Sequence, residues 1–414
     1  MTTLPRTGVP WPELKAQLEQ AGKNDVDWRG GRVPMFIHYA GDDVLDVAKQ
    51  AYLMYFSENG LGLRAFGSLE RFETEVVSMG LGLLHGGPLA CGAMTTGGTE
   101  SIFLAVKAAR DQACQRRPGI GLPRIVMAES AHPAFDKAAH FMGLEAVRTP
   151  LRADFTADPE AIGKAITPNT VMVVGSAPAF PHGVVDPIGE IASIASAKGI
   201  WMHVDACVGG YFAPFAQQLG VQLPDWDFTV SGVTSISADL HKYGYAAKGA
   251  STLFFRDADG FAGMGWYFDK WPRGQYFTNT LVGTRAGGAI AAAWAVMNYL
   301  GEEGYQRIAS RVLAIRLKLQ IGAAELGLTT FGNPQLSILA YGSPEHDFAA
   351  VGSELSRRGW VPGYVTSPDG LHHMLNLTHE PVVGRYLDDL AASLAHARKA
   401  ASGRQVRGEL TARY

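Results

Sequence analysis

The pattern of apolar and polar residues along the chain changes near residue 90. Before that point it is helical after a Pro-rich start, and Val44, Leu45 and Ala48 belong to an apolar stripe over residues 42–55. A second helix is predicted over residues 68–84, with Ser68 as its N-cap. Residues 1–60 are therefore expected to form an N-terminal helical segment.

From residue 90 to about residue 283, short apolar strands alternate with helical stretches. Strands that are apolar on both faces and joined by helices indicate an α/β domain with a mostly parallel sheet flanked by helices. Ligands of such sheets bind beyond the carboxyl ends of the strands. Strands are predicted at 124–128, 171–175, 200–205, 228–231 and 252–255. Helices are predicted at 101–116, 133–142, 158–166 and 187–198.

After residue 283 the pattern is helical for two long stretches, 286–300 and 303–326. A strand at 336–340, a helix at 347–358, a strand at 371–377 and a helix at 383–400 are predicted next. The expected organisation is a large α/β domain at 61–300 and a small C-terminal α+β domain at 301–414.

Composition narrows the functional classes. The 414 residues are 47% apolar and 18% charged, and the net charge is -3, so no basic excess favours nucleic-acid binding. No stretch reaches the roughly 18 apolar residues of a membrane helix, and the N-terminus lacks the apolar region of a signal peptide. Cys91, Cys114 and Cys207 fit no zinc or disulfide framework. We expect a cytoplasmic protein without an integral membrane segment.

The first candidate for chemistry is the glycine-rich sequence TTGGTES at 95–101, directly before a predicted helix. Free N–H groups and the positive end of the helix dipole at such a turn suit a phosphate group. The simpler interpretation is an ordinary helix N-cap with a glycine turn.

Three further residues follow predicted strands. Asp205 ends an otherwise apolar strand and needs a cation, which an ion pair, a metal or a cofactor's ring nitrogen would supply. Lys242 is flanked by His and Tyr and would form a Schiff base if its amine were partly neutral, although most lone lysines lie in surface loops. His132 would stack on a planar ring or serve as a buried, hydrogen-bonded histidine.

Together these four features match the needs of a pyridoxal 5'-phosphate (PLP) site. The lysine holds the aldehyde, and the carboxylate keeps the pyridine nitrogen protonated, so that the ring accepts the electrons released at Cα. Ser237 and His241, near the lysine, are candidates for additional phosphate donors.

The same segments resemble a known family. Residues 96–101, 203–210 and above all VTSISADLHKYGY at 233–245 resemble the sphingosine-1-phosphate lyases, which belong with the group II PLP decarboxylases of fold type I. The similarity continues through FPHGVVDP at 180–187, GTRAGG at 283–288 and FGNPQLS at 331–337. The resemblance implies a PLP-dependent lyase with a large and a small domain.

The resemblance also implies a role for each matching residue. Lys242 would bind the cofactor's aldehyde, Asp205 would pair with its ring nitrogen, and His132 would stack on its ring. The cofactor's phosphate would be held by Gly97, Gly98, Thr99, Ser237 and His241.

Further roles concern the substrate and the assembly. In such enzymes a loop like 283–285 crosses a dimer interface, so Thr284 would reach the phosphate in the partner's site of a homodimer. Lys248 matches a lysine that serves the substrate in this family, and Tyr243, Lys248 and a phosphate oxygen of the cofactor are the candidates for the general base. His85 lies in a segment that resembles the family's substrate-phosphate region, although a helix-end cap explains it as well.

The chain departs from the family at one loop. Lyases often carry an Asn-Pro-Leu-His-Pro-like stretch where this chain reads NGLGLR at 59–64. Because that loop is expected at the mouth of the site, the identity of the substrate depends on it, and Arg64 would hold a phosphate or a carboxylate there.

The resemblance to the lyase family implies a reaction that cleaves Cα–Cβ of a phosphorylated 2-amino-3-hydroxy compound, such as sphingosine 1-phosphate, to an aldehyde and phosphoethanolamine. The alternative is a group II amino-acid decarboxylase. The absence of an arginine at 371–377 disfavours an aminotransferase, and the presence of both Asp205 and Lys242 disfavours a scaffold without catalysis. Neither a complete Rossmann glycine motif nor a metal-ligand cluster occurs in the sequence, so we expect no metal site.

Overall fold

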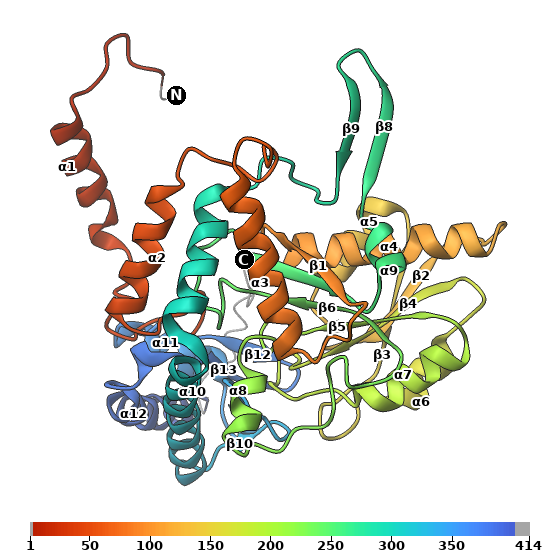
Figure 1. The fold of residues 1–414 in the computed structure, drawn as a ribbon. Helices are drawn as coiled ribbons and strands as arrows, with labels where there is room; N and C mark the ends of the chain where they lie inside the picture. The colour runs from red at the N-terminus through yellow and green to blue at the C-terminus, as the bar shows by residue number, and fades with distance from the viewer. Residues whose placement is uncertain (1–2, 402–414) are drawn as a thin grey trace.

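A seven-stranded sheet forms the centre of the molecule in the computed structural model, which describes residues 3–401 (Figure 1). All strands run parallel except β7, which is antiparallel to both of its neighbours. The predicted mostly parallel sheet is therefore confirmed. In spatial order the strands are β1 (Cys91–Thr95), β7 (Ser251–Phe255), β6 (Val233–Ala238), β5 (Trp201–Asp205), β4 (Thr170–Ser176), β2 (Arg124–Ala128) and β3 (Glu145–Thr149).

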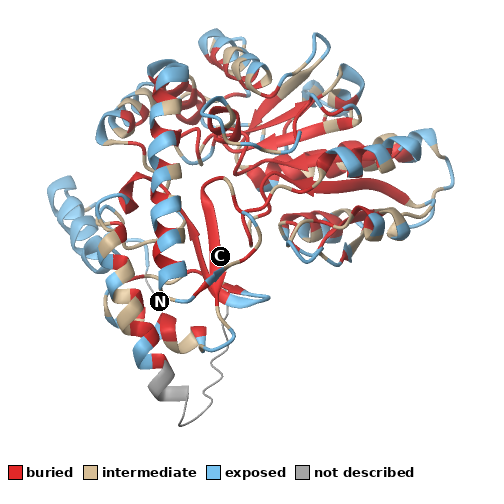
Figure 2. Ribbon diagram, turned by 90° about the horizontal axis from the view of Figure 1, so that it is seen from below, coloured by how far each residue is buried: buried red, intermediate tan, exposed pale blue. Residues whose placement is uncertain are grey.

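Helices cover both faces of this sheet because its strands present apolar side chains to both sides. In β2, Ile125 and Met127 belong to one apolar core, whereas Val126 and Ala128 belong to the other. Figure 2 shows the buried residues concentrated in the strands, with exposed residues on the outer helix faces. The covering helices include α4 (Gly98–Arg116), α5 (Ala134–Met142) and α9 (Ala258–Ala262) on one side, and α3 (Gly67–Leu83), α6 (Pro159–Ala165), α7 (Ile188–Ala197) and α8 (Ala213–Gln218) on the other.

Helix α10 (Gly287–Glu325) connects the sheet domain to the rest of the chain and packs against α3 and α2 (Asp42–Met54) (Figure 1). At Gly301 its backbone leaves the helical conformation, with φ at 54°, so the two helices predicted here meet at this bend. Helix α1 (Trp11–Ala21) and the 3-10 turn η1 (Gly22–Asn24) precede α2. None of the helices in the described part of the chain is long and apolar enough to cross a membrane.

A smaller C-terminal unit contains an antiparallel sheet with helices, in agreement with the predicted small α+β domain. The predicted boundary at residue 300 falls inside α10 and stays a prediction, and residues 402–414 of the predicted domain lie outside the described residues. The elements of this unit are β10 (Thr329–Thr330), β11 (Ile338–Gly342), α11 (Phe348–Arg357), β12 (Tyr364–Thr366), β13 (Asp369–Met374), η2 (Leu377–His379) and α12 (Val383–Ala401).

Two local predictions differ from the structure, and one projecting element was not predicted. The strand predicted at 228–231 is wrong: these residues form turns and are apolar because Phe228 and Val230 are buried in the core. Ser68 is not an N-cap, since α3 already begins at Gly67. The hairpin of β8 (Trp266–Trp271) and β9 (Gly274–Thr278), which projects from the molecule, was not predicted (Figure 1).

Asp186 joins two loops beside the central sheet. Its carboxylate is almost fully buried and accepts the backbone N–H groups of Ala157 at 2.8 Å and Ser176 at 2.7 Å, one on each oxygen. Burial raises the pKa of Asp186 to about 6, above its ordinary value. Because the pKa is higher in the folded state, this group lowers the free energy of unfolding as the pH rises from about 4 to about 6.

We predict that Asp186→Asn lowers the free energy of unfolding by roughly 1–3 kcal/mol at neutral pH, because the amide nitrogen would face one of the two buried N–H donors. Urea unfolding measures this, and the fall in stability attributed to Asp186 should be absent from the variant's pH profile. The matched control is Asp158→Asn, since Asp158 is the N-cap of α6 and asparagine also caps helices. Equal stability of Asp186→Asn and the wild type would contradict the prediction.

Candidate active site

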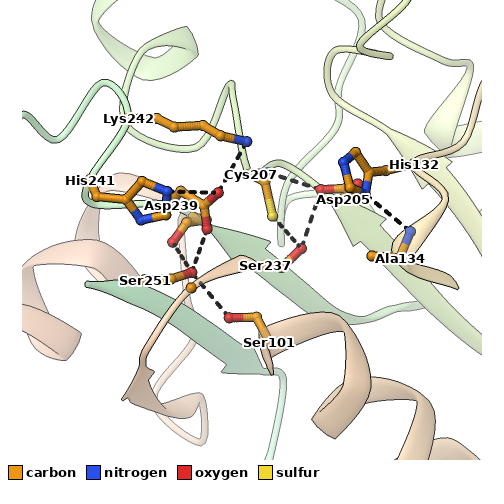
Figure 3. A network of polar contacts seen from close by, with 12 residues as sticks. Ser101, His132, Ala134, Asp205, Cys207, Ser237, Asp239, His241, Lys242 and Ser251 are labelled. Carbon is orange, nitrogen blue, oxygen red and sulfur yellow. Dashed lines mark hydrogen bonds and ion pairs between the residues drawn. The ribbon is translucent and has the colours of Figure 1, made fainter. Parts of the chain in front are cut away.

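One cavity at the carboxyl ends of β4 and β5 contains most of the residues that the sequence singled out. Its volume is about 380 Å³, within the range of small-molecule sites. The polar residues around it are drawn in Figure 3. The sequence-predicted residues that line it are Gly97, Gly98, Thr99, His132, Asp205, His241 and Lys242.

Lys242 reaches this cavity from the turn after β6 and forms an ion pair with Asp239 (Figure 3). Its Nζ lies 3.1 Å from Oδ2 of Asp239, and Oδ1 of the same carboxylate accepts the hydroxyl of Ser251 at 2.6 Å. Burial alone lowers the pKa of Lys242, but the negative charge of Asp239 outweighs it, and the net pKa lies above its ordinary value. The free amine is therefore held protonated until a ligand rearranges this pair.

Asp239 was not among the residues predicted from the sequence, although a signal was available. It is a carboxylate directly after a buried strand and three residues before the lysine, and like Asp205 it needs a cation. Asp239 is only 3% exposed, and Lys242 supplies the cation.

Asp205 ends β5 on the opposite wall of the cavity. Its Oδ1 accepts the backbone N–H of Cys207 at 3.1 Å and the hydroxyl of Ser237 at 3.4 Å. No described residue hydrogen-bonds to its Oδ2, although the side chain is only 8% exposed. Because Asp205 lines the cavity, its Oδ2 is free to accept a hydrogen bond from a ligand there, and a protonated ring nitrogen would donate one.

The N-terminus of α4 closes the same cavity with Gly97, Gly98 and Thr99. None of their three N–H groups has a partner among the described residues, so they are free to bind a phosphate group. A Cβ on Gly98 would lie 2.8 Å from both Oδ1 of Asp239 and Sγ of Cys207, so this position accepts only glycine. The residues present thus fit a ligand with a phosphate, a ring nitrogen and an aldehyde.

Two histidines on the cavity wall are electrically neutral. The backbone N–H of Ala134 donates to Nδ1 of His132 at 3.2 Å, which places the proton of His132 on Nε2. Burial lowers the pKa of His132 below its ordinary value, and an uncharged imidazole is suited to stacking on an aromatic ring. His241 donates from Nδ1 to the carbonyl of Ala250 at 2.8 Å, and burial likewise lowers its pKa.

Two assignments from the sequence are corrected by the structure. Ser237 does not face the phosphate cradle: it is fully buried and donates to Asp205. Tyr243 is fully buried as well, and its hydroxyl donates to the carbonyl of Leu375 at 2.7 Å, so it does not line the cavity and is not available as a base. In both cases backbone geometry, which the motif does not specify, sets the direction of the side chain.

The remaining candidates lie outside the cofactor cavity of this chain. Lys248 is nearest: its Nζ donates to the carbonyl of His241 at 3.2 Å, and it lines an adjoining cavity that shares His241. His85 hydrogen-bonds through Nδ1 to Asp227 at 2.7 Å and lines a separate cavity. Arg64 and Thr284 are both exposed on loops. The roles assigned to these four residues stay predictions.

Glu100, which the sequence analysis also missed, connects the glycine turn to the loop that carries Thr284. Its Oε2 accepts both the N–H and the hydroxyl of Thr96, at 2.7 and 2.5 Å. Its Oε1 accepts the N–H groups of Leu281 and Val282, at 2.8 and 3.1 Å. The signal available in the sequence was a glutamate at the start of a predicted helix, with no Lys or Arg three or four residues later to pair with it.

The sequence similarity of this chain to known proteins agrees with the arrangement of the residues in this cavity. A family model described as "Pyridoxal-dependent decarboxylase conserved domain" matches residues 74–323. The sphingosine-1-phosphate lyase of Arabidopsis thaliana is 40% identical over 388 residues, which cover 91% of this chain and 71% of that protein. Sphingosine-1-phosphate lyase 1 of Mus musculus is 37% identical over 401 residues, which cover 96% of this chain and 70% of that protein.

The chain belongs to the sphingosine-1-phosphate lyase family. Among solved structures, the sphingosine-1-phosphate lyase of Burkholderia pseudomallei has a TM-score of 0.93 at 36% identity, covering 97% of this chain and 94% of that one. The glutamate decarboxylase of Lactobacillus brevis has a TM-score of 0.84 at 16% identity, covering 98% of this chain and 96% of that one, and shares the fold. PLP fold type I and the PLP cofactor, both expected from the sequence, are confirmed.

In this lyase-family site, the cofactor's contacts follow from the observed residues. Lys242 would hold the aldehyde, Asp205 Oδ2 the ring nitrogen, and the first turn of α4 the phosphate. Among residues 3–401, no three or more His, Cys, Asp and Glu side chains are grouped to hold a metal ion.

We predict that Asp239→Asn lowers the pKa of Lys242 by about one unit or more, because it removes the largest of the charge effects that oppose burial. Cofactor-free protein should then react with PLP at lower pH than the wild type, since only the neutral amine attacks the aldehyde. Stopped-flow absorbance across a pH series measures the midpoint, with Lys242→Ala as the baseline. An unchanged or higher midpoint would show that Asp239 does not control this amine.

Proposed function

We propose that the protein is a PLP-dependent aldehyde lyase that acts on a phosphorylated 2-amino-3-hydroxy compound such as sphingosine 1-phosphate. The observation that carries the proposal is identity of 33–40% to seven sphingosine-1-phosphate lyases along more than nine-tenths of the chain, combined with the intact Lys242 and Asp205 pair. The products are a long-chain aldehyde and phosphoethanolamine.

In this reaction the proton of the C3 hydroxyl is removed, the C2–C3 bond breaks to release the aldehyde, and C2 receives a proton. When bound, PLP accepts the electron pair left on C2. Lys242 would anchor the cofactor, Asp205 would keep a proton on its ring nitrogen, and His132 would stack on its ring.

Lys248 is the residue we assign to proton transfer at the substrate. It stands beside the cofactor cavity, and both burial and the neighbouring charge of Lys242 lower the pKa of its amine. A lowered pKa makes an amine a better acid–base group near neutral pH. With Tyr243 hydrogen-bonded to Leu375, Lys248 is the side chain that remains from the sequence-based candidates for the base.

The test compares products. Incubation with sphingosine 1-phosphate should give aldehyde and phosphoethanolamine in equal amounts, and a panel of amino acids should release no carbon dioxide. Lys242→Ala should abolish the reaction, whereas Lys248→Ala should keep the bound cofactor and lower kcat by roughly 10²–10⁴-fold. Carbon dioxide without aldehyde would instead support the decarboxylase alternative, to which the decarboxylase-type domain at 74–323 points.

We further propose a homodimer in which Thr284 and Arg64 serve the partner's site. Backbone contacts hold their two loops together. Asn59 and Ala286 form an isolated antiparallel β-bridge, and the N–H of Gly60 donates to the carbonyl of Arg285 at 2.8 Å. Both side chains are exposed and lie outside the cofactor cavity of their own chain.

The neighbouring surface supports a buried interface. The β8–β9 hairpin projects from the molecule (Figure 1). The hairpin and the loop that follows it, which leads to Thr284, expose several large apolar side chains, a pattern typical of an interaction surface. These side chains are Trp266, Tyr267, Phe268, Trp271, Phe277, Leu281 and Val282.

Mixed dimers test this arrangement. Thr284→Ala alone should weaken PLP binding about tenfold or more, because a hydrogen bond to a charged phosphate is lost. Mixing Thr284→Ala subunits with Lys242→Ala subunits should restore one complete site per mixed dimer, and with it wild-type PLP affinity at that site. If Thr284 acts within its own chain, or not at all, mixing restores nothing.

A further inference from the structure

A series of five buried side chains runs beneath the cofactor cavity and ends on Asp205. We call Trp201, Ser235, His203, Ser237 and Asp205 the hydrogen-bond series. They occupy alternate positions of the neighbouring parallel strands β5 and β6, with His203 paired to Ser235 and Asp205 to Ser237. Side chains at alternate strand positions share one face, so the series lies along one side of the sheet.

The distances connect all five side chains. Trp201 Nε1 lies 2.8 Å from Ser235 Oγ, which lies 2.7 Å from His203 Nδ1. His203 Nε2 lies 3.2 Å from Ser237 Oγ, which lies 3.4 Å from Asp205 Oδ1. Each of the five side chains is at most 8% exposed.

The chemistry of the two end groups fixes the direction of every hydrogen bond. An indole N–H only donates, so Trp201 donates to Ser235. Ser235 then donates its own proton to Nδ1 of His203, which leaves the imidazole proton on Nε2. His203 donates that proton to Ser237, and Ser237 donates to the carboxylate of Asp205, which only accepts.

The opposite tautomer of His203 leaves buried groups without partners. With the proton on Nδ1, Ser235 would face two donors and its own hydroxyl proton would have no acceptor. Ser237 would then donate to Nε2 of His203 instead of to Asp205. Unpaired polar groups are costly in an environment that excludes water.

His203 is neutral, as the series requires. Burial lowers its pKa to about 4, against a smaller opposing effect of Asp205. The other titratable groups that face Asp205 are His132 and Lys242 across the cavity, Cys207 on the following turn, and Asp186 behind the strand. Two of these groups are connected to Asp205 through Ser237: His203 Nε2 lies 3.2 Å from Ser237 Oγ, and the Cys207 thiol, a weak donor, lies 3.4 Å from the same oxygen.

We propose that His203, oriented by Ser235 and Trp201, is a positioning residue that acts through Ser237 to hold the Asp205 carboxylate turned toward the cofactor's ring nitrogen. The inference rests on PLP as the cofactor but not on the substrate. The sequence assigned Ser237 to the cofactor's phosphate. In this proposal Ser237 instead affects the proton affinity of the ring nitrogen, at the other end of the cofactor.

The experiment follows the ring nitrogen directly. Holoenzyme is prepared with PLP that carries ¹⁵N in its ring, and the ¹⁵N shift, which differs between the protonated and neutral ring, is recorded from about pH 6 to about pH 9.5. We expect the wild type to stay protonated further into the alkaline range than Ser237→Ala and His203→Phe. The midpoints of both variants should fall by about one pH unit, a tenfold loss of proton affinity.

Two controls separate this role from a general loss of packing. Ser237→Thr keeps the hydroxyl and should behave as the wild type. Thr234→Val removes a hydroxyl on the same strand that binds the N–H of Met202 at 3.2 Å, outside the series, and should leave the ring nitrogen unchanged. A ring nitrogen equally protonated in the wild type, Ser237→Ala and His203→Phe across the whole range would overturn the proposal.

The tautomer is tested without cofactor or substrate, which keeps this result distinct from failure of the proposed function. In protein labelled with ¹⁵N-histidine, the signal of His203 is identified by its absence from His203→Phe. We expect the pattern of a neutral ring with its proton on Nε2, changing to the other tautomer in Ser235→Ala. A proton on Nδ1 in the wild type would refute the direction of the series.

Discussion

The balance of charge inside one cavity is the constraint on which this site depends. Two buried carboxylates, Asp205 and Asp239, face a space in which Lys242 is paired with Asp239 alone. Asp205 accepts hydrogen bonds from Cys207 and Ser237 but forms no ion pair within the described residues, so a positive partner from outside the polypeptide would complement its charge. A protonated pyridine ring supplies that charge, and its phosphate meets the uncapped N–H groups of α4. Cofactor binding would therefore supply a positive partner for Asp205 and an anion for the N–H groups of α4, in addition to its chemistry.

The parallel sheet explains how distant residues meet. Asp205 and Lys242 are far apart in sequence, but each follows one of two adjacent strands, β5 and β6, whose carboxyl ends lie at the same edge. The glycine turn follows β1 at that edge and starts α4. Of these three strands, only β5 was predicted from its buried apolar pattern, at 200–205; β6 and β1 were not, and the strand predicted ahead of Lys242 was placed at 228–231 instead of 233–238. The strand at 124–128 was predicted with its observed bounds from the same kind of pattern.

The features that were not predicted from the sequence concern the directions in which side chains point, which the periodicity of apolar residues does not specify. Ser237 lies on the face of β6 that meets Asp205, and its position became clear only from the register of β5 and β6. Tyr243 turns toward the C-terminal unit because its hydroxyl finds the carbonyl of Leu375. The β8–β9 hairpin exposes its aromatic side chains and so lacks the buried pattern of a strand in a closed core. Long-range contacts decided all three.

The glycine at position 98 has a meaning beyond the approach of a phosphate. Its missing side chain leaves the space that the Asp239 carboxylate and the Cys207 thiol occupy. Any larger residue would push that carboxylate away from Lys242 and release the amine from its counter-ion. Gly98 thus helps to keep Asp239 in place beside the Lys242 amine. A change in the backbone at Gly98 would therefore change the basicity of that amine on the other wall of the cavity.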